Sequence, residues 1–85
     1  MENVRVLGIT VSNRLEEASK LQGVLTKYGC HIRTRLGLHE ASKESCSRNG
    51  LIILELVGEE SGWDKFEEEL TAIEGVFVKK MDFTL

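Results

Sequence analysis

The chain has 85 residues, 41% of them hydrophobic, and a formal net charge of −3. This length suits one compact domain, and the hydrophobic fraction is enough for one ordinary core, so two domains and intrinsic disorder are both excluded. The negative charge argues against bulk electrostatic binding of nucleic acid, and two cysteines are too few for a disulfide scaffold. No signal peptide or membrane span is visible, so we expect residues 1–85 to form a single domain of a reduced, cytoplasmic protein.

The first third of the chain predicts a strand and an amphipathic helix. Residues 4–11 are rich in β-branched side chains and are apolar at both parities, which is typical of a central strand covered on both faces. Asn13 and Glu16 form a capping-box pattern that opens a helix over residues 13–28. Its apolar stripe consists of Leu15, Ala18, Leu21, Leu25 and Tyr28. Gly29 is expected to end this helix with a positive φ.

The middle of the chain predicts a hairpin with a long loop. Residues 30–38 alternate, which indicates a half-exposed strand. One face would hold Cys30, Ile32, Thr34, Leu36 and Leu38, and the other His31, Arg33, Arg35 and Gly37. Residues 40–50 contain no large apolar side chain and end in Asn-Gly, so they predict a long hairpin loop. Residues 51–57 are almost continuously apolar and predict a second central strand.

The last third predicts a turn over residues 58–62, a second helix and a final strand. Ser61 and Asp64 resemble another capping box. The helical stripe that follows is formed by Trp63, Phe66, Leu70 and Ile73. Gly75 would end this helix, and residues 76–83 would form the last strand.

The predicted order is β-α-β-β-α-β, in two halves that echo each other. With right-handed crossovers this order closes into an α+β ferredoxin-like sandwich, in which two helices cover one face of a four-stranded antiparallel sheet. The first and third strands would lie in the middle of the sheet. No linker or low-complexity segment interrupts the chain.

The two central strands place apolar side chains on both faces of the predicted sheet. In the first strand, Val6 would point to one face of the sheet and Leu7 and Ile9 to the other. In the third strand, Ile52 and Leu54 would point to one face and Leu51 and Ile53 to the other. Helices cover one face only, and an exposed apolar face usually marks an interface. We therefore expect a homodimer or homotetramer, joined through a strand edge or through the open sheet face. A monomer with an ordinary apolar face is the alternative.

Two polar segments are candidates for binding a small anion. The turn that leaves the first strand offers free amides at a helix N-terminus, although capping alone would also account for Ser12 and Asn13. Arg33 and Arg35 form a basic stripe with His31 that could hold a carboxylate or phosphate, or could be the solvated face of an edge strand. The predicted ligand surface, drawn from neighbouring strands or subunits, consists of Ser12, Asn13, Arg14, Arg33, Arg35 and His39.

Metal binding and catalysis have weaker support. Nitrogen and sulfur ligands gather in the predicted hairpin, but no C-x-x-C or H-x-H spacing occurs, and Cys30 is expected to face the core. An intersubunit metal site formed by His31, His39 and Cys46 remains open. The chain has no P-loop, no glycine-rich dinucleotide turn and no interpretable catalytic triad, and residues 67–69 are expected to be a solvated face. The central strands also lack the aromatic residues that stack RNA bases, so we expect neither an enzyme nor an RNA reader.

Three short motifs resemble a family of small bacterial proteins named iron-only hydrogenase system regulators. They are VLGITV at residues 6–11, RTRLGL at residues 33–38, and IEGV followed by a valine and a lysine at residues 73–79. The resemblance spans nearly the whole chain. It implies an ACT-like ferredoxin fold, similar to the C-terminal domain of the nickel-responsive repressor. Such domains oligomerise and bind amino acids, metals or other small effectors at subunit interfaces, and the family name implies regulation associated with hydrogenase genes.

The sequence departs from the nickel-responsive repressor in two respects. The paired His-x-His followed by Cys is absent, because His39 stands alone before Cys46, and no residues are left for a ribbon-helix-helix. We therefore expect neither direct nickel sensing nor direct DNA binding. The leading hypothesis is a non-enzymatic regulatory module that binds a small effector or a partner protein as a homo-oligomer. A metal-responsive sensor is the second hypothesis and a small enzyme the third, and the sequence identifies no cofactor.

Overall fold

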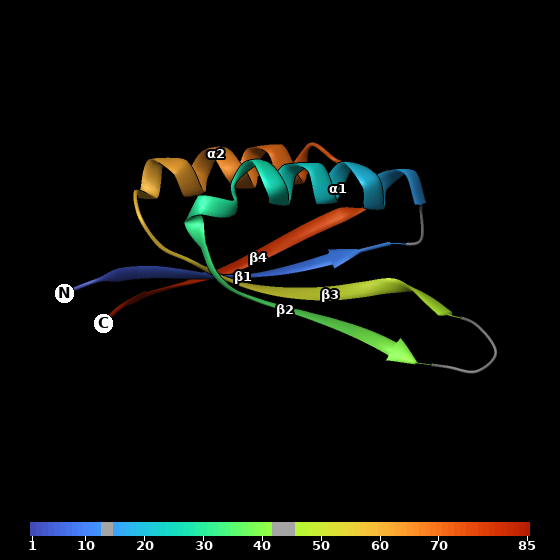
Figure 1. The fold of residues 1–85 in the computed structure, drawn as a ribbon, viewed down its shortest axis with the longest axis horizontal. Coiled ribbons are helices and arrows are strands. Elements are labelled where there is room, and N and C mark those ends of the chain that lie inside the picture. The colour runs from blue at the N-terminus through green and yellow to red at the C-terminus, as the bar shows by residue number, and fades with distance from the viewer. Residues whose placement is uncertain (13–14, 42–45) are drawn as a thin grey trace.

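The computed structural model of the chain has two layers, with both helices on one face of a four-stranded sheet (Figure 1). It describes the backbone of residues 1–12, 15–41 and 46–85, and the side chains of residues 1–12, 19–37 and 50–85. The elements are β1 (Asn3–Val11), α1 (Leu15–Lys27), the short 3₁₀ helix η1 (Gly29–His31), β2 (Ile32–Ala41), β3 (Cys46–Leu56), α2 (Glu60–Thr71) and β4 (Val76–Thr84).

The sheet has the strand order β2-β3-β1-β4, and every neighbouring pair is antiparallel. β1 and β3 therefore occupy the middle, as the apolar runs in both strands predicted. Beyond the strand ends, Glu2 and Leu85 exchange backbone hydrogen bonds of 3.0 and 2.7 Å, so both termini lie at the same end of the molecule (Figure 1). The expected ferredoxin-like βαββαβ architecture is confirmed.

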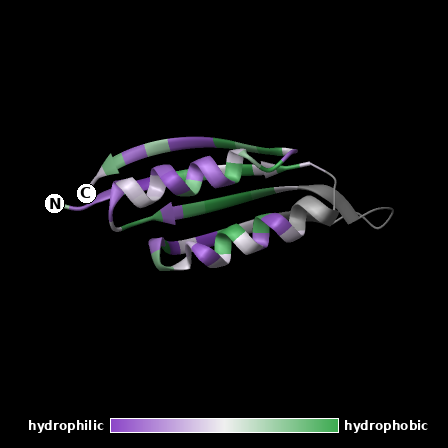
Figure 2. Cartoon of the chain, turned by 90° about the horizontal axis from the view of Figure 1, so that it is seen from above, coloured by the Kyte–Doolittle hydropathy of each residue, from purple (hydrophilic) through white to green (hydrophobic). Residues whose placement is uncertain are grey.

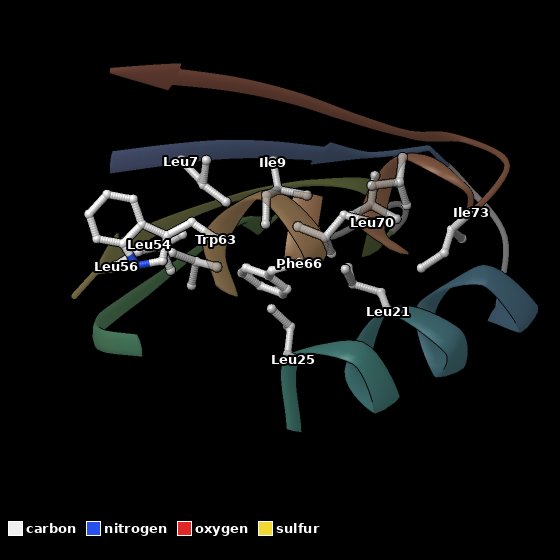
Figure 3. Packing of buried hydrophobic residues seen from close by; sticks show 12 residues of the cluster. Leu7, Ile9, Leu21, Leu25, Leu54, Leu56, Trp63, Phe66, Leu70 and Ile73 are labelled. Carbon is white, nitrogen blue, oxygen red and sulfur yellow. The ribbon is translucent and has the colours of Figure 1, made fainter. Parts of the chain in front are cut away.

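The hydrophobic core fills the space between the sheet and the helices (Figure 3). Leu7 and Ile9 of β1 point into it and are completely buried, as is Phe66 of α2. The other central members include Leu21, Leu25, Leu54, Leu56, Trp63 and Leu70. The apolar stripe of α2 and the described part of the α1 stripe thus face the sheet, because residues three or four apart share one side of a helix.

Arg5 is a charged residue at a core-facing position of β1, and its side chain is only 7% exposed. Its Nε and Nη2 atoms donate to the Asp82 carboxylate of β4 at 2.6 and 3.0 Å, and its Nη1 donates to Asp64 and Glu67 of α2 at 3.0 and 2.5 Å. The guanidinium also lies 5.2 Å from the centre of the Trp63 ring. The Arg5 hydrogen bonds hold the pKa of Asp82 below its ordinary value. One buried cation therefore ties β1 and β4 to α2.

The predicted helix ends are partly wrong. α2 begins at Glu60, and the preceding Glu59 makes no side-chain capping bond, so Ser61 lies inside the first turn and does not cap the helix. α1 ends at Lys27, and Gly29 opens the 3₁₀ turn without a positive φ. The 3₁₀ turn connects α1 to β2 without the left-handed residue that the glycine suggested. The Asn13–Glu16 cap lies outside the described residues.

The long loop predicted over residues 40–50 is also wrong. β2 continues to Ala41, and β3 already begins at Cys46. The ladder pairs His39 with Gly50 and Ala41 with Cys46. Strand pairing uses backbone groups, which small polar residues supply as well as apolar ones do. The Asn-Gly pair at residues 49–50 accordingly lies within a strand and does not form a turn.

Gly75 joins α2 to β4 in a conformation that disfavours any other residue. Its φ is +83°, and a Cβ atom placed there would lie 2.5 Å from the Ser12 Oγ. The Ser12 hydroxyl can rotate away from such a Cβ atom, so most of the destabilisation caused by a side chain at Gly75 would come from the positive φ. We expect Gly75→Ala to lower the free energy of unfolding by about 1–2 kcal/mol, measured by urea denaturation.

Gly23→Ala is the matched control for this substitution. Gly23 lies inside α1, and a Cβ atom there would meet no other atom within 4 Å. The control should raise the free energy of unfolding by about 0.5–1 kcal/mol, because alanine is the better helix former. Equal stability of Gly75→Ala and the wild type would contradict the role given to Gly75.

Candidate functional site

Ser12 is the one described residue of the turn after the first strand that was predicted to bind a small anion. It is exposed where β1 ends, and its amide donates to the Gly75 carbonyl oxygen at 2.9 Å. This bond fastens the exit of β1 to the loop between α2 and β4. Asn13 and Arg14 lie outside the described residues.

A β-bulge near the start of β2 separates the two arginines that were predicted to share one face. Ile32 pairs with Leu56 on the helix-covered side, whereas Thr34 pairs with Glu55 on the opposite side. The register therefore shifts at Arg33, and the next residue with core parity is Arg35, which pairs with Leu54. The predicted stripe of His31, Arg33 and Arg35 is wrong, because an extra residue in one strand reverses the alternation that follows it.

Arg33 is engaged by two carboxylates. Its Nη1 atom donates to both oxygens of Glu2 at 3.1 Å, and its Nη2 donates to Glu55 at 2.6 Å. The Thr34 hydroxyl donates to the other Glu55 oxygen at 2.8 Å. The pKa of Glu55 is lowered by Arg33 and, to a smaller degree, by Thr34. An anionic ligand at Arg33 would have to displace one of these carboxylates.

Arg35 has a different environment. It is exposed on the helix-covered side of the edge strand β2, and its Nη2 atom donates to the Gln22 side-chain oxygen of α1 at 3.1 Å. Within the described side chains, no carboxylate forms an ion pair with Arg35. Among the described contacts, its donors are thus not used by a carboxylate. His39 follows on the same strand, opposite Gly50, and its side chain is not among those described.

Ser12 and Arg35 do not converge within one chain. Arg35 is level with Leu54 of β3, whereas Val11, the residue before Ser12, is level with Gly50. Four residues of β3 separate these levels, which corresponds to about 13 Å along the strand. A ligand surface that used both residues would need a second copy of the chain.

The predicted metal ligands are also separated. The His31 Nδ1 atom lies 3.3 Å from the Val57 carbonyl oxygen, and the ring packs against Gly58 and Gly62 at the start of α2. His39 lies eight residues further along the chain, roughly 26 Å away in an extended strand. Over residues 1–12, 19–37 and 50–85, no three histidine, cysteine or acidic side chains form a potential metal site.

Cys30 was expected to face the core and this expectation is wrong, because Cys30 is exposed. It lies in η1 and not in β2, so the strand alternation never applied to it. Cys46 begins β3 and pairs with Ala41, and its side chain is not described.

The face of the sheet opposite the helices, here called the open face, carries exposed apolar side chains. Phe77, Met81 and Phe83 of β4 are 66, 58 and 47% exposed, and Leu36 of β2 is 53% exposed. Residues 51–56 of the central strand β3 are hydrophobic apart from Glu55 (Figure 2). The predicted apolar open face is thus present, and no described helix or strand covers it (Figure 1).

The fold is similar to several solved structures. An uncharacterised protein from Thermotoga maritima has a TM-score of 0.82 and 23% identity, over 98% of this chain and 100% of that one. The ACT domain of a GTP pyrophosphokinase from Chlorobium tepidum has a TM-score of 0.67 and 17% identity, over 95% and 100%. A nitrogen regulatory PII-like protein from Thiomonas intermedia, bound to ADP, AMP and bicarbonate, has a TM-score of 0.59 and 16% identity, over 98% and 92%.

These similarities establish an ACT-like, ferredoxin-like fold. No protein-family model matches the chain, and no curated protein matches it. In the described part of the chain, neither helix has the length and apolar character needed to cross a membrane.

The Arg33 cluster yields a prediction for the pKa of Glu55. Arg33→Gln should raise this pKa toward its ordinary value, because Arg33 is the main cause of its depression. A depressed folded-state pKa stabilises the fold at neutral pH, and this contribution is lost as the pH falls through that pKa. Carboxyl NMR titration of both proteins measures the change.

Lys27→Gln is the control for this titration. Lys27 donates to Glu69, whose pKa is lowered first by Tyr28 and then by Lys27. The control should therefore raise the pKa of Glu69 and leave that of Glu55 where it is in the wild type. An unchanged Glu55 titration in Arg33→Gln would show that the Arg33–Glu55 contact does not form in solution.

Proposed function

We propose that this chain is a non-enzymatic regulatory module that binds a small anionic effector as a homo-oligomer. The main support for anion binding is Arg35, whose exposed guanidinium has the neutral side-chain amide of Gln22 as its described partner. Exposed arginines near acidic side chains usually pair with them, as Arg33 does with Glu2 and Glu55. Arg35 thus has donors left for a carboxylate or phosphate, which a guanidinium binds with two parallel hydrogen bonds.

The ACT-like fold supports the regulatory part of this proposal. The similar structures include an ACT domain from a larger enzyme and a PII-like protein bound to ADP, AMP and bicarbonate, all of them small anions. We propose that Arg35, with His39, forms one wall of the effector site. The other wall would be the exit of β1 in a neighbouring copy, with Ser12, Asn13 and Arg14, because one chain holds Ser12 and Arg35 apart.

We further propose that the regulated process is a hydrogenase system, as the sequence resemblance implies, and that the chain acts there in the cytoplasm through a partner protein. A net charge of −3 gives no long-range attraction to the phosphate backbone of DNA. A partner would then carry any contact with nucleic acid, and the effector would control that partner.

Thermal-shift screening tests this proposal. The purified chain is mixed with amino acids, nucleotides, bicarbonate and inorganic phosphate, and any compound that raises the melting temperature is titrated calorimetrically. We expect at least one anionic compound to bind, and Arg35→Ala to weaken its affinity roughly tenfold or more, because a hydrogen bond to a charged group is lost.

Lys65→Ala is the matched control, since Lys65 is an exposed cation on α2, away from β2. It should bind the same compound with unchanged affinity. Equal affinity of Arg35→Ala and the wild type would remove Arg35 from the site, and a screen in which no compound binds would overturn the proposed function.

A further inference from the structure

We propose that the open face is the docking surface for a second copy of this chain, so that two sheets pack face to face. This inference deepens the homo-oligomer of the proposed function and rests on it. The apolar members of the surface are Val6, Leu36, Leu51, Ile53, Phe77, Met81 and Phe83. They come from all four strands of the sheet.

The strand register places these side chains on one face. Residues directly opposite each other in antiparallel strands point to the same side of a sheet. Met81 pairs with Val6, which pairs with Glu55 on the face away from Leu54. Leu36 pairs with Ile53 on that same face. The exposed apolar residues of the outer strands therefore continue the partly exposed row of the central strands, and the patch is contiguous.

The size of this face matches what a stable dimer needs. Strands of about nine residues extend roughly 30 Å, and four strands side by side are about 19 Å wide, which gives about 570 Å² in projection. Side chains make the accessible area larger than the projection, and a standard interface uses about 800 Å² from each partner. Polar residues such as Glu55 and Lys79 share this face, but exposed apolar side chains on several strands are typical of an interface.

The charges on the open face favour a second copy over a charged partner. The carboxylate of Glu55 is already neutralised by Arg33 within the chain. Lys79 lies level with Gly8 at the centre of β4, and within the described side chains it has no ion-pair partner. Among the side chains that the structure describes, this face has no cluster of like charges that an oppositely charged protein would recognise, and its apolar residues can pack against those of a second copy.

The position of Lys79 favours one of two ways in which the two copies could pack. A two-fold axis that runs across the strands would stack β4 on β4 and bring the two Lys79 ammonium groups together. An axis that runs along the strands places β4 of one copy over β2 of the other. The second arrangement separates the two lysines: it places each Lys79 level with Leu36 of the partner subunit, at the sheet edge where the ammonium group can reach solvent, with Phe77 and Met81 two residues to either side. Aligned sheets pack about 10 Å apart, which suits interdigitated side chains of these sizes.

The test is sedimentation equilibrium of the full chain at about 1 to 100 µM, a range that covers micromolar affinity. We expect the wild type to form a dimer, and Met81→Glu to raise the dimer dissociation constant roughly 100-fold or more, because a carboxylate would be buried without a partner. Phe77→Ser should act in the same direction without adding charge. Both residues are more than half exposed, so the monomer should fold in each variant, which circular dichroism checks.

Two controls complete the design. Lys65→Glu adds a carboxylate on the exposed side of α2 and should leave the dimer intact, whereas Met81→Leu keeps the apolar contact and should also dimerise. A wild type that is monomeric at about 100 µM would overturn the proposal. A dimer that survives both Met81→Glu and Phe77→Ser would overturn it as well, and would point to a contact through an edge of the sheet, β2 or β4.

This outcome is separable from that of the effector screen. A monomeric chain that still binds an anion through Arg35 would overturn both the open-face interface and the wall proposed from a neighbouring copy, and would leave anion binding by Arg35 standing. A dimer that dissociates on Met81→Glu but binds no anion would support the interface and overturn the effector.

Discussion

The sheet of this protein has two apolar faces, and its helices cover only one of them. The same backbone that buries Leu7 and Leu54 under α2 turns Val6 and Ile53 to the other side, because successive side chains of a strand alternate. The core, the stripes of the helices and the row on β4 all follow from this arrangement. A hydrophobic set of that extent contributes to stability only when a second layer removes it from water.

The helix layer also limits how far the core extends. Near the start of β1 the core-facing position before Leu7 belongs to Arg5, and the large apolar side chain of Trp63 lies against its guanidinium. Asp64 and Asp82 are 66 and 53% exposed, so they keep most of their hydration while they bind the buried guanidinium. A buried cation is tolerated here because two of its three carboxylate partners keep their hydration and the third, Glu67, bonds it directly.

The sequence predicted the parts of the fold that depend on periodicity. The two apolar parities of β1 and β3 and the stripe of Trp63, Phe66 and Leu70 are all confirmed. The bulge at Arg33 could not be predicted, because it changes which residues of β2 and β3 lie opposite each other and leaves no mark in the alternation of the sequence. The sequence predicted too short a hairpin, because residues 46–50 pair through their backbone and show no apolar pattern. The Arg5 cluster was missed because its members are far apart in the sequence.

The bulge at Arg33 gives the two faces of β2 separate roles. Before the bulge, Ile32 lies on the helix-covered side of the sheet. After it, Leu36 lies on the open face and Arg35 contacts Gln22 of α1. A second copy on the open face would bury Leu36 and leave Arg35 accessible, because the sheet itself lies between them. Dimer formation on the open face and anion binding by Arg35 can therefore occur together on opposite sides of one strand, and a neighbouring copy that supplied Ser12 to the effector site would have to pack elsewhere than on the open face.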